Sequence, residues 1–446
     1  MIICQDEIRA RFASALSEMY QREVPQYGTL LELVSNINQR HKGQGGQDIQ
    51  HRIEVERHGA IRLGTPDELG TMRRLFLILG MEPVGYYDLS VAGLPVHATC
   101  FRPLTKESLS QNPFRVFTSL LRPEMIGDQQ LRDHVEDILK ARHIFSPRCL
   151  ELMNEWEKAP FSSQALVDEL INESLQTFRW HETTTVDRET YEALQAAHPL
   201  IADVVCFRGP HINHLTPRVA DIDEAQLEML RRGLQPKKVI EGPPAMRCPI
   251  LLRQTSFLAL EERISFSNWD EVDGKHKARF GEIEQRGMAL TPKGRSLYDE
   301  ITRPKRTLPK DSLVIDHCDC SIATFKDFPD DYSTIRREKL GYFTYHVSNV
   351  PSTPVETHDL DSLISAGIIS FEPITYEDFL PISAAGIFQS NLGTGSFCSS
   401  EARSDKARFE ASLGTPVLSE FDLYGEMERL SLVQAYGKLS IPFFGV

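Results

Sequence analysis

The pattern of apolar and polar positions predicts that the chain opens with helices. Over residues 6–23, apolar side chains recur every three or four positions, which is the spacing of a helix with one buried face. Pro25 ends this helix because proline lacks the amide hydrogen that a helix interior requires. We therefore assign residues 1–50 to an N-terminal helical segment.

Residues 51–122 follow the pattern of a βαβββ module. A strand is predicted over residues 53–63, and a helix begins after Thr65, a favourable N-cap residue. That helix ends at Gly80, since glycine adopts the left-handed conformation common at helix ends. Three further strands are predicted at residues 83–89, 95–101 and 114–121.

Residues 199–292 repeat this pattern. A strand over residues 212–218 precedes a predicted helix that begins at Asp221 and ends near Gly233. His58 and Arg62 in the first module correspond to His214 and Arg218 in the second, with the same spacing of His-x-x-x-Arg. Such self-similarity indicates an internal repeat. Further strands are predicted at residues 238–240, 249–257 and 278–286.

Two other parts do not follow the module pattern. Apolar residues in 123–198 keep helical spacing throughout, which predicts a helical insertion. Residues 293–446 are predicted to form a C-terminal region that contributes to the cleft, with a last helix over residues 400–413 and an apolar tail. The sequence therefore predicts an α+β fold in which two βαβββ modules form a shared metal cleft.

Composition and charge exclude several classes of protein. The 446 residues are 41% hydrophobic and 25% charged, which is typical of a soluble globular protein with more than one core. The net charge of −14 argues against nucleic acid as a partner, because nucleic-acid binding requires basic surfaces. We find no apolar run of about 18 residues, so we expect no membrane span.

Cysteine usage and the first residues of the chain favour a cytoplasmic location. The eight cysteines are scattered, and none forms a Cys-x-x-Cys pair. In a chain of this length, that pattern is typical of reduced thiols. Residues 1–23 lack the basic start and apolar run of a signal peptide.

Three predicted strands carry the residues of a candidate metal site. The strand over residues 278–286 places Glu282 and Glu284 on one face. Together with His58 and His214, one of these carboxylates completes a set of two histidines and a carboxylate, which is typical of non-haem iron(II) oxygenases. Zinc accepts the same ligands, so the ligand types leave the metal open. The spacing also leaves the choice between Glu282 and Glu284 open.

Arg62 is the candidate for binding a substrate carboxylate. It lies four residues after His58, so both side chains share one face of a strand. The planar guanidinium group suits a bidentate contact with a carboxylate. The alternative is a structural ion pair with Glu56 or another strand neighbour, and for Arg218 both interpretations remain open.

Four stretches of the sequence resemble one known family. They are residues 56–62 (ERHGAIR), 211–218 (HINHLTPR), 280–287 (FGEIEQRG) and 374–388 (ITYEDFLPISAAGIF). Together they resemble the 2-oxoadipate dioxygenase/decarboxylase family, which has the vicinal-oxygen-chelate fold. The resemblance implies an iron(II) enzyme of lysine breakdown that converts 2-oxoadipate and dioxygen to D-2-hydroxyglutarate and carbon dioxide.

The resemblance also implies roles for individual residues. The metal ligands of the family fall on His58, His214 and Glu282. The choice of Glu282 is supported by a further likeness of residues 280–286 to the ligand strand of hydroxyphenylpyruvate dioxygenases.

In the same way, the arginine that binds substrate in the family falls on Arg62. A substrate contact through the backbone falls near Ile382 and Ser383. The position of Ile382 is often valine in the family, which is a small change. The implied partners are a small 2-oxo dicarboxylic acid and dioxygen, and the sequence leaves the oligomeric state open.

Three other classes of function remain compatible with the sequence. An isomerase or lyase of the same fold would use zinc, nickel or manganese and consume no oxygen. An extradiol-type dioxygenase would consume oxygen but require a catechol. A non-catalytic protein that binds small acids would use Arg62 without a metal.

Overall fold

The chain has a mixed α+β fold, as predicted. The computed structural model describes residues 2–42, 47–257, 259–267, 272–302, 324–350, 357–380 and 405–443. The chain folds as two compact units. The first unit comprises Met1–Glu241, Gln254–Gln285 and Phe379–Leu418, and the second comprises Gly242–Arg253, Arg286–Asp378 and Ser419–Val446.

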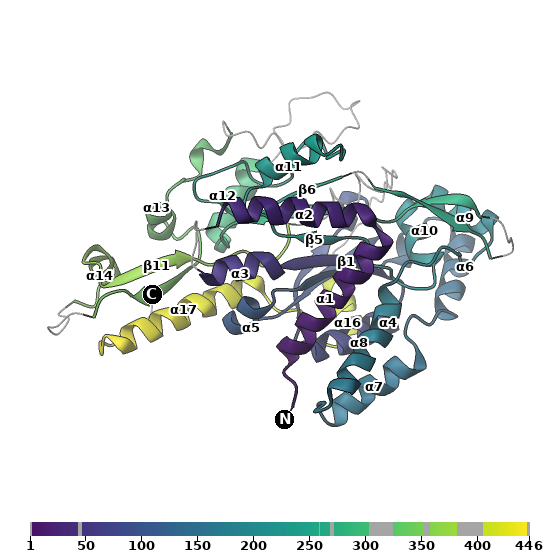
Figure 1. The fold of residues 1–446 in the computed structure, drawn as a ribbon, viewed down its shortest axis with the longest axis horizontal. Coiled ribbons are helices and arrows are strands. Elements are labelled where there is room, and N and C mark those ends of the chain that lie inside the picture. Colours follow the sequence, from purple (N-terminus) through teal and green to yellow (C-terminus); the bar gives the residue numbers. More distant parts are fainter. Residues whose placement is uncertain are drawn as a thin grey trace. The chain divides into compact units, whose positions relative to one another are not determined.

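Helices open the first unit. They are α1 (Gln5–Glu23), α2 (Pro25–Arg40) and α3 (Gln47–Val55). The prediction of α1 is confirmed, and Pro25 both ends α1 and begins α2. The predicted start of the first strand at residue 53 is wrong, because Ile49 and Ile53 stand four positions apart and continue α3. Figure 1 shows α1 and α2 as consecutive helices that meet at an angle.

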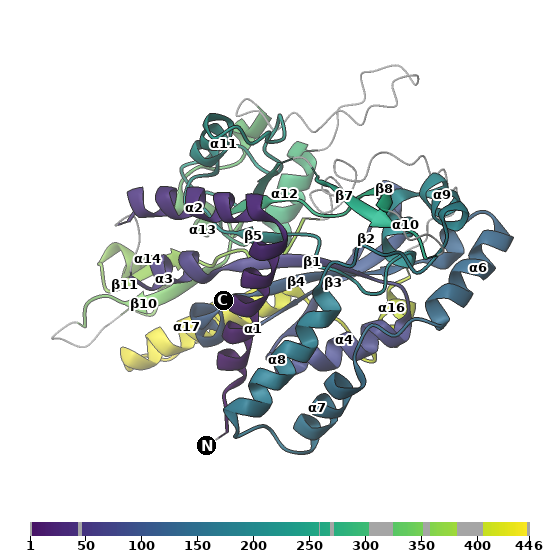
Figure 2. The same cartoon turned by 45° about the vertical axis from the view of Figure 1, so that its right-hand side comes forward.

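A five-stranded sheet lies at the centre of the first unit. Its strands are β1 (Arg57–Leu63), β2 (Glu82–Asp88), β3 (Val96–Arg102), β4 (Arg115–Leu121) and β5 (Leu215–Pro217), in the order β2-β3-β4-β1-β5. β1 runs parallel to β4 and antiparallel to β5. Figure 2 shows β1, β3 and β4 together in the turned view. The connections are α4 (Pro66–Ile78), α5 (Lys106–Gln111) and the 3-10 turns η1 (Ser90–Ala92) and η2 (Pro123–Met125).

The strand β5 is shorter than its prediction. Residues 212–214 lie outside it, and it ends at Pro217, which has no amide hydrogen to donate to a neighbouring strand. His58 lies opposite Thr216 in the register of β1 and β5. His214 therefore precedes its strand, whereas His58 lies within β1.

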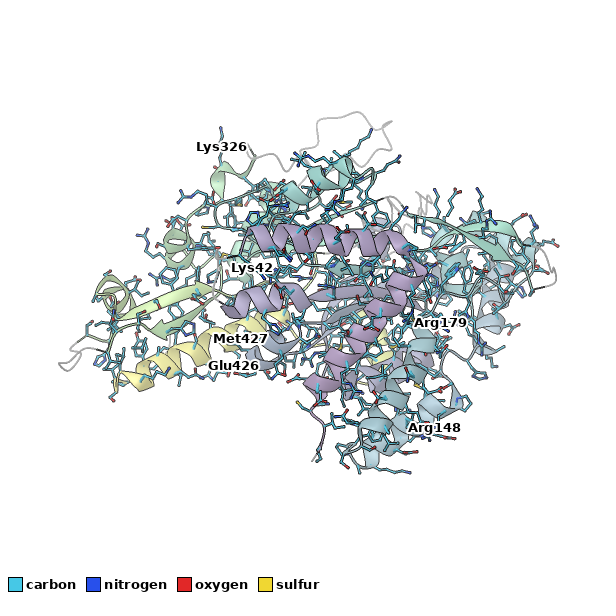
Figure 3. All side chains as sticks on the ribbon, viewed as in Figure 1. Lys42, Arg148, Arg179, Lys326, Glu426 and Met427 are labelled. Atoms are coloured by element: carbon cyan, nitrogen blue, oxygen red, sulfur yellow. The ribbon has the colours of Figure 1, made fainter. Side chains whose placement is uncertain are left out.

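The helices predicted for residues 123–198 are present. They are α6 (Gln129–Lys140), α7 (Pro147–Lys158), α8 (Gln164–Phe178) and α9 (Arg188–Ala197), and α10 (Pro199–Val205) follows them. Ion pairs on their outer faces involve exposed residues. Arg148, labelled in Figure 3, forms such pairs with Glu151, Glu155 and Glu169. Pairs of this exposed kind contribute little to stability.

The remaining elements lie wholly or mostly in the first unit, and they include a hairpin that the sequence did not predict. The elements are α11 (Ile222–Arg231), β6 (Leu252–Ser256), β7 (Glu261–Ser265), β8 (Val272–Lys277), β9 (Glu282–Arg286) and α16 (Lys406–Leu413). β6 pairs with β9, and β7 pairs with β8. Residues 238–240 form no strand, so that prediction is wrong. The hairpin was missed because β7 has a single buried residue, Ile264, and carries few apolar residues.

The second unit contains a two-stranded sheet with a long helix against it. Its elements are α12 (Pro292–Thr302), η3 (Thr324–Asp327), α13 (Tyr332–Arg337), β10 (Phe343–Val347), α14 (Leu360–Ser365), β11 (Ile369–Pro373) and α17 (Glu420–Lys438). β10 and β11 are antiparallel. Within this unit, Glu428 and Ser431 of α17 accept hydrogen bonds from backbone amides of β10. The predicted apolar tail is therefore wrong, since most of it forms α17.

No helix in the described ranges combines the length and the apolar character that crossing a membrane requires. The five cysteines within those ranges (Cys4, Cys100, Cys149, Cys206 and Cys248) are free thiols.

His97 on β3 makes stability depend on pH. It is buried, and its ring centroid lies 4.7 Å from that of Phe409 on α16. Burial, assisted by the charge of Arg122, lowers the pKa of His97 from 6.5 to about 4. The unfolded chain therefore binds the proton more tightly between these two pH values. The stabilisation is complete above pH 6.5 and is lost as the pH falls towards 4.

We expect this loss to be at most about 3.5 kcal/mol, since each pKa unit corresponds to about 1.4 kcal/mol. In a His97→Gln variant, the free energy of unfolding, measured in urea, should decrease less than in the wild-type protein as the pH is lowered from 6.5 to 4. Equal pH dependence in the two proteins would show that His97 does not titrate in this way.

Candidate functional site

The predicted metal-binding residues lie together in the first unit. His58 is the second residue of β1, His214 immediately precedes β5, and Glu282 is the first residue of β9. One ligand atom from each residue lies within 4.8 Å of the others. The three residues are 1%, 3% and 1% exposed. A buried carboxylate beside two buried imidazoles is a candidate metal-binding group.

Glu282 is held through one of its two carboxylate oxygens. Its Oε2 lies 3.1 Å from Nε2 of His58 and 3.3 Å from Nδ1 of His214. The same oxygen accepts hydrogen bonds from the hydroxyl of Thr216 (2.8 Å) and the amide of Gln254 (3.2 Å). Oε1 is buried and has no hydrogen-bond partner within the described residues. A buried carboxylate oxygen in this condition is costly unless a cation compensates it.

The hydrogen bonds of His214 indicate which ring nitrogen is available as a ligand. Thr216 donates its single hydroxyl hydrogen to Glu282 and lies 2.8 Å from Nδ1 of His214. Nδ1 of His214 must therefore donate to Thr216, which leaves the lone pair on Nε2. This tautomer fits a histidine that binds a metal through Nε2.

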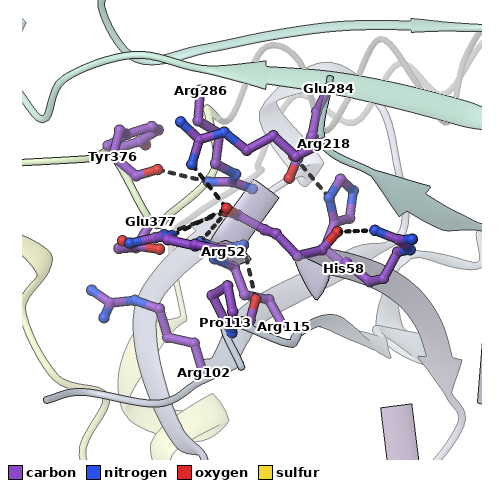
Figure 4. Close-up of polar contacts among 12 residues, drawn as sticks. Arg52, His58, Arg102, Pro113, Arg115, Arg218, Glu284, Arg286, Tyr376 and Glu377 are labelled. Atoms are coloured by element: carbon purple, nitrogen blue, oxygen red, sulfur yellow. Dashed lines mark hydrogen bonds and ion pairs between the residues drawn. The ribbon is translucent and has the colours of Figure 1, made fainter. Parts of the chain in front are cut away.

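Glu282 and Glu284, which the spacing could not distinguish, occupy different positions. Glu282 belongs to the three-residue group, whereas Oε2 of Glu284 lies 2.9 Å from Nδ1 of His58. Figure 4 draws this contact as a dashed line between Glu284 and His58. A carboxylate at this nitrogen orients the ring so that Nε2 faces the candidate metal position.

Two glycines permit the backbone approach on which the site depends. A Cβ at Gly59 would lie 2.6 Å from Ile212 and 3.1 Å from the backbone oxygen of His214, so β1 could not lie this close to the His214 segment. A Cβ at Gly281, beside Glu282, would lie 1.9 Å from the ring of Phe257. Each glycine directly adjoins a candidate ligand.

Aromatic rings surround the two histidines. The ring of His214 stacks on Phe280, with centroids 4.7 Å apart, and the ring of His58 meets the edge of Phe379 at 4.9 Å. Phe117 in turn contacts Phe379. These rings restrict the imidazoles and keep water away from them.

The three candidate ligands have shifted pKa values. Burial lowers the pKa of His214 to about 3, against the opposing effect of Glu282, so the ring is neutral at pH 7. Burial also disfavours charged His58, but Glu284 and Glu282 raise its pKa above the ordinary value. Burial disfavours charged Glu282, but His214 and His58 hold its pKa below the ordinary value. The neutral ring of His214 beside the charged carboxylate of Glu282 is the protonation state that metal binding requires, whereas the raised pKa of His58 means that its ring must release a proton when a metal binds.

Arg62 lies on the same strand as His58 but contacts a residue that the sequence did not indicate. It is buried and forms an ion pair with Asp203 of α10. A structural ion pair was the alternative interpretation of Arg62, and its partner here comes from a helix rather than from Glu56 or a neighbour on the strand. Asp203 also contacts His276 and His211.

Arg218 instead pairs with Glu56, which precedes β1. Glu56 is fully buried and contacts Arg115 (2.7 Å), Arg218 (2.8 Å) and Arg52 (3.2 Å). Figure 4 shows the side chains of these three arginines close to one another. In the ion-pair interpretation, the partner of Arg218 is therefore Glu56. Because Glu56 directly precedes β1, its contacts with the three arginines hold the chain in place where the strand begins.

Several residues at the site were missed by the sequence interpretation. Thr216 and Gln254 contact Glu282. Asp203 pairs with Arg62, and it is contacted in turn by His211 and His276. Asp203 had a usable signal, since it is the one charged residue in the apolar segment 199–205. Ile382 and Ser383, for which a substrate contact was predicted, lie outside the described residues.

Two other features of the first unit do not coincide with this group. A cavity of about 450 Å³ is lined by residues that include Gly64, Arg122 and Arg142, but by none of the three candidate ligands. His41, Asp221 and Glu224 form a second cluster, which is partly exposed. Its contacts are those of a helix cap and surface ion pairs.

The fold and the candidate site define a class: a mixed α+β protein with a buried group of two histidines and one carboxylate. Comparison with known proteins places the chain more closely. The model of the 2-oxoadipate dioxygenase/decarboxylase family matches residues 12–391, and the chain belongs to that family.

Relatives with this name share about half of their residues with the chain. The 2-oxoadipate dioxygenase/decarboxylase of Escherichia coli (strain K12) is 52% identical over 443 residues, covering 96% of this chain and 98% of that relative. The protein of the same name from Pseudomonas putida is 49% identical, with 96% of each chain covered. The crystal structure of hydroxyglutarate synthase from Pseudomonas putida in complex with 2-oxoadipate has 48% identity and a TM-score of 0.89, with 99% of each chain covered.

Proposed function

We propose that this protein converts 2-oxoadipate and dioxygen to D-2-hydroxyglutarate and carbon dioxide, with iron(II) held by His58, His214 and Glu282. The observation that carries the proposal is the buried group of these three residues in a chain that is 48% identical to a hydroxyglutarate synthase. When bound, iron(II) supplies a centre with open positions for a 2-oxo acid and dioxygen. Both atoms of dioxygen enter the product, one in the new carboxylate and one in the hydroxyl group.

The residues around the three ligands support this proposal. Thr216 and Gln254 hold Oε2 of Glu282, so that the carboxylate has a fixed orientation and Oε1 points to no other described partner. Nε2 of His58 lies 3.1 Å from Oε2 of Glu282, and either a proton on the imidazole or a bound cation satisfies this contact. Two imidazoles and a carboxylate with a free oxygen are a donor set that fits a divalent metal.

Arg62 is proposed to bind the distal carboxylate of the substrate. It lies four residues after His58 on the same face of β1, about 13 Å along the strand at ~3.3 Å per residue. A six-carbon diacid with its oxo acid end at the metal would cover part of this span, and the long arginine side chain would cover the rest. We further propose that Ile382 and Ser383 contribute the backbone contact to the substrate that the family resemblance implies.

The order of elements supports the first βαβββ module, which consists of β1, α4, β2, β3 and β4. We propose that β5, α11, β6 and β9 form a second, related module, which has the added hairpin of β7 and β8 and lacks the strand predicted at residues 238–240. In this arrangement the first strand of each module supplies or adjoins one histidine, and the last strand of the second supplies Glu282.

We further propose a cytoplasmic location, which the free thiols of the described cysteines support.

An oxygen electrode tests the proposed function. With iron(II), a reductant and 2-oxoadipate, we expect oxygen uptake that matches the carbon dioxide released, mole for mole. An isomerase, a lyase or a binding protein would consume no oxygen with this substrate. Absence of uptake by the iron-loaded protein would contradict the proposal.

A further inference from the structure

A chain of buried polar groups lies behind Arg62. Asp203 belongs to α10, whose other residues are apolar, and its side chain is 2% exposed. A charged carboxylate at such a position requires compensation by partners that are themselves well placed. Burial disfavours the charged form of Asp203, but Arg62, His211 and His276 hold its pKa well below the ordinary value.

The two carboxylate oxygens of Asp203 contact different residues. Oδ2 pairs with the guanidinium group of Arg62, whereas Oδ1 lies 2.9 Å from Nε2 of His276 and 3.3 Å from Nε2 of His211. The carboxylate therefore cannot rotate without losing one of these contacts. Arg62, at the other end, loses much of the rotational freedom that a long side chain would otherwise keep.

The histidines are fixed in turn by other elements. Nδ1 of His276 lies 2.9 Å from the hydroxyl of Tyr191 on α9, and the indole of Trp180 stacks parallel to the His276 ring at 6.1 Å. Trp180 also meets the ring of His211 edge-on at 4.8 Å. Figure 2 shows α9 and α10 next to β7 and β8. Four elements, β1, α10, β8 and α9, thus hold the guanidinium group of Arg62.

We propose that Asp203 is a positioning residue that fixes Arg62 and thereby sets the selectivity for the chain length of the 2-oxo diacid. This inference rests on the proposed function of Arg62. A guanidinium group held at one distance from the metal fits a diacid of one length. If the group can move, it follows the distal carboxylate of shorter and longer diacids, and discrimination falls.

The experiment compares 2-oxo diacids of five, six and seven carbons. The value of kcat/KM for each diacid is measured with the wild-type protein and with the Asp203→Asn and His276→Gln variants. Asp203→Asn also removes a negative charge that repels the substrate, but this effect is common to all three diacids and cancels in their ratios. We expect the preference for the six-carbon acid to be about tenfold or more in the unchanged protein. It should fall at least about fivefold in Asp203→Asn and by a smaller factor in His276→Gln.

A second readout does not depend on turnover. The dissociation constants of the three diacids are measured by calorimetry without oxygen, and their ratios should change in the same direction. Glu68→Gln is the matched control, because Glu68 is also a buried carboxylate that pairs with an arginine, Arg142, with contacts of 2.8 Å. This control should lower the thermal midpoint without changing the ratios.

The possible outcomes separate the inference from the proposed function. Unchanged ratios in Asp203→Asn, or an equal loss of kcat/KM for all three acids together with a lower thermal midpoint, would overturn the positioning role while the function stands. If the unchanged protein shows no oxygen-dependent turnover, the proposed function fails, and the binding ratios still test Asp203. If Asp203→Asn does not fold, His276→Gln decides, because it leaves the buried carboxylate in place.

Discussion

The His214→Ala variant is expected to lose its bound metal and its activity. His214 would supply one of the three ligands, and the site offers no replacement imidazole among the described residues that surround Glu282. A metal ion contributes several kcal/mol of transition-state stabilisation, so turnover should fall by more than about a thousandfold. Metal analysis of the purified variant, with activity on 2-oxoadipate, measures both effects.

His134→Ala provides the matched control for this experiment. His134 is an exposed residue of α6, and its replacement removes one imidazole without touching the site. It should retain both metal and turnover. Full metal occupancy and activity in His214→Ala would remove His214 from the ligand set.

The Arg62→Ala variant is expected to keep its metal and lose turnover of 2-oxoadipate. Losing one partner of a buried, hydrogen-bonded charge pair between protein and ligand costs about 3–5 kcal/mol of binding free energy, which corresponds to a loss of roughly a hundredfold to a few thousandfold in kcat/KM. Arg62→Lys should also be impaired, because a point charge does not reproduce the planar bidentate contact. Metal content, thermal midpoint and kcat/KM distinguish the two effects.

The matched substrate is a six-carbon 2-oxo acid without the distal carboxylate. The Arg62→Ala variant should be impaired much less with this monoacid, since the missing contact is to the distal group. A purely structural ion pair between Arg62 and Asp203 predicts instead that both substrates lose activity alike, along with stability. Near-normal kcat/KM on 2-oxoadipate would show that Arg62 does not bind the distal carboxylate.

The sequence predicted the positions of His58 and Arg62 better than those of His214 and Arg218, for a geometric reason. His58 and Arg62 both lie within β1, so the alternation of side chains along a strand places them correctly. His214 and Arg218 lie just outside the three residues of β5, and there the alternation no longer applies. Their positions depend on the close approach of the His214 backbone to Gly59 and on the ion pair of Arg218 with Glu56.

The contacts behind the site could not be read from local patterns. The partner of Arg62 is Asp203, 141 residues away in sequence, and only the folded chain brings them together. The strand β7 was missed since its mostly charged residues lack an alternating pattern. The helix α17 was missed because its polar and apolar residues are interleaved, although Tyr424, Leu432 and Tyr436 are buried.

Isotope labelling tests the central claim most directly. The iron-loaded protein is supplied with 2-oxoadipate and dioxygen labelled with heavy oxygen, and the product is analysed by mass spectrometry. The account predicts one labelled atom in the hydroxyl group of 2-hydroxyglutarate and one in its new carboxylate. A product whose hydroxyl oxygen comes only from water would contradict it.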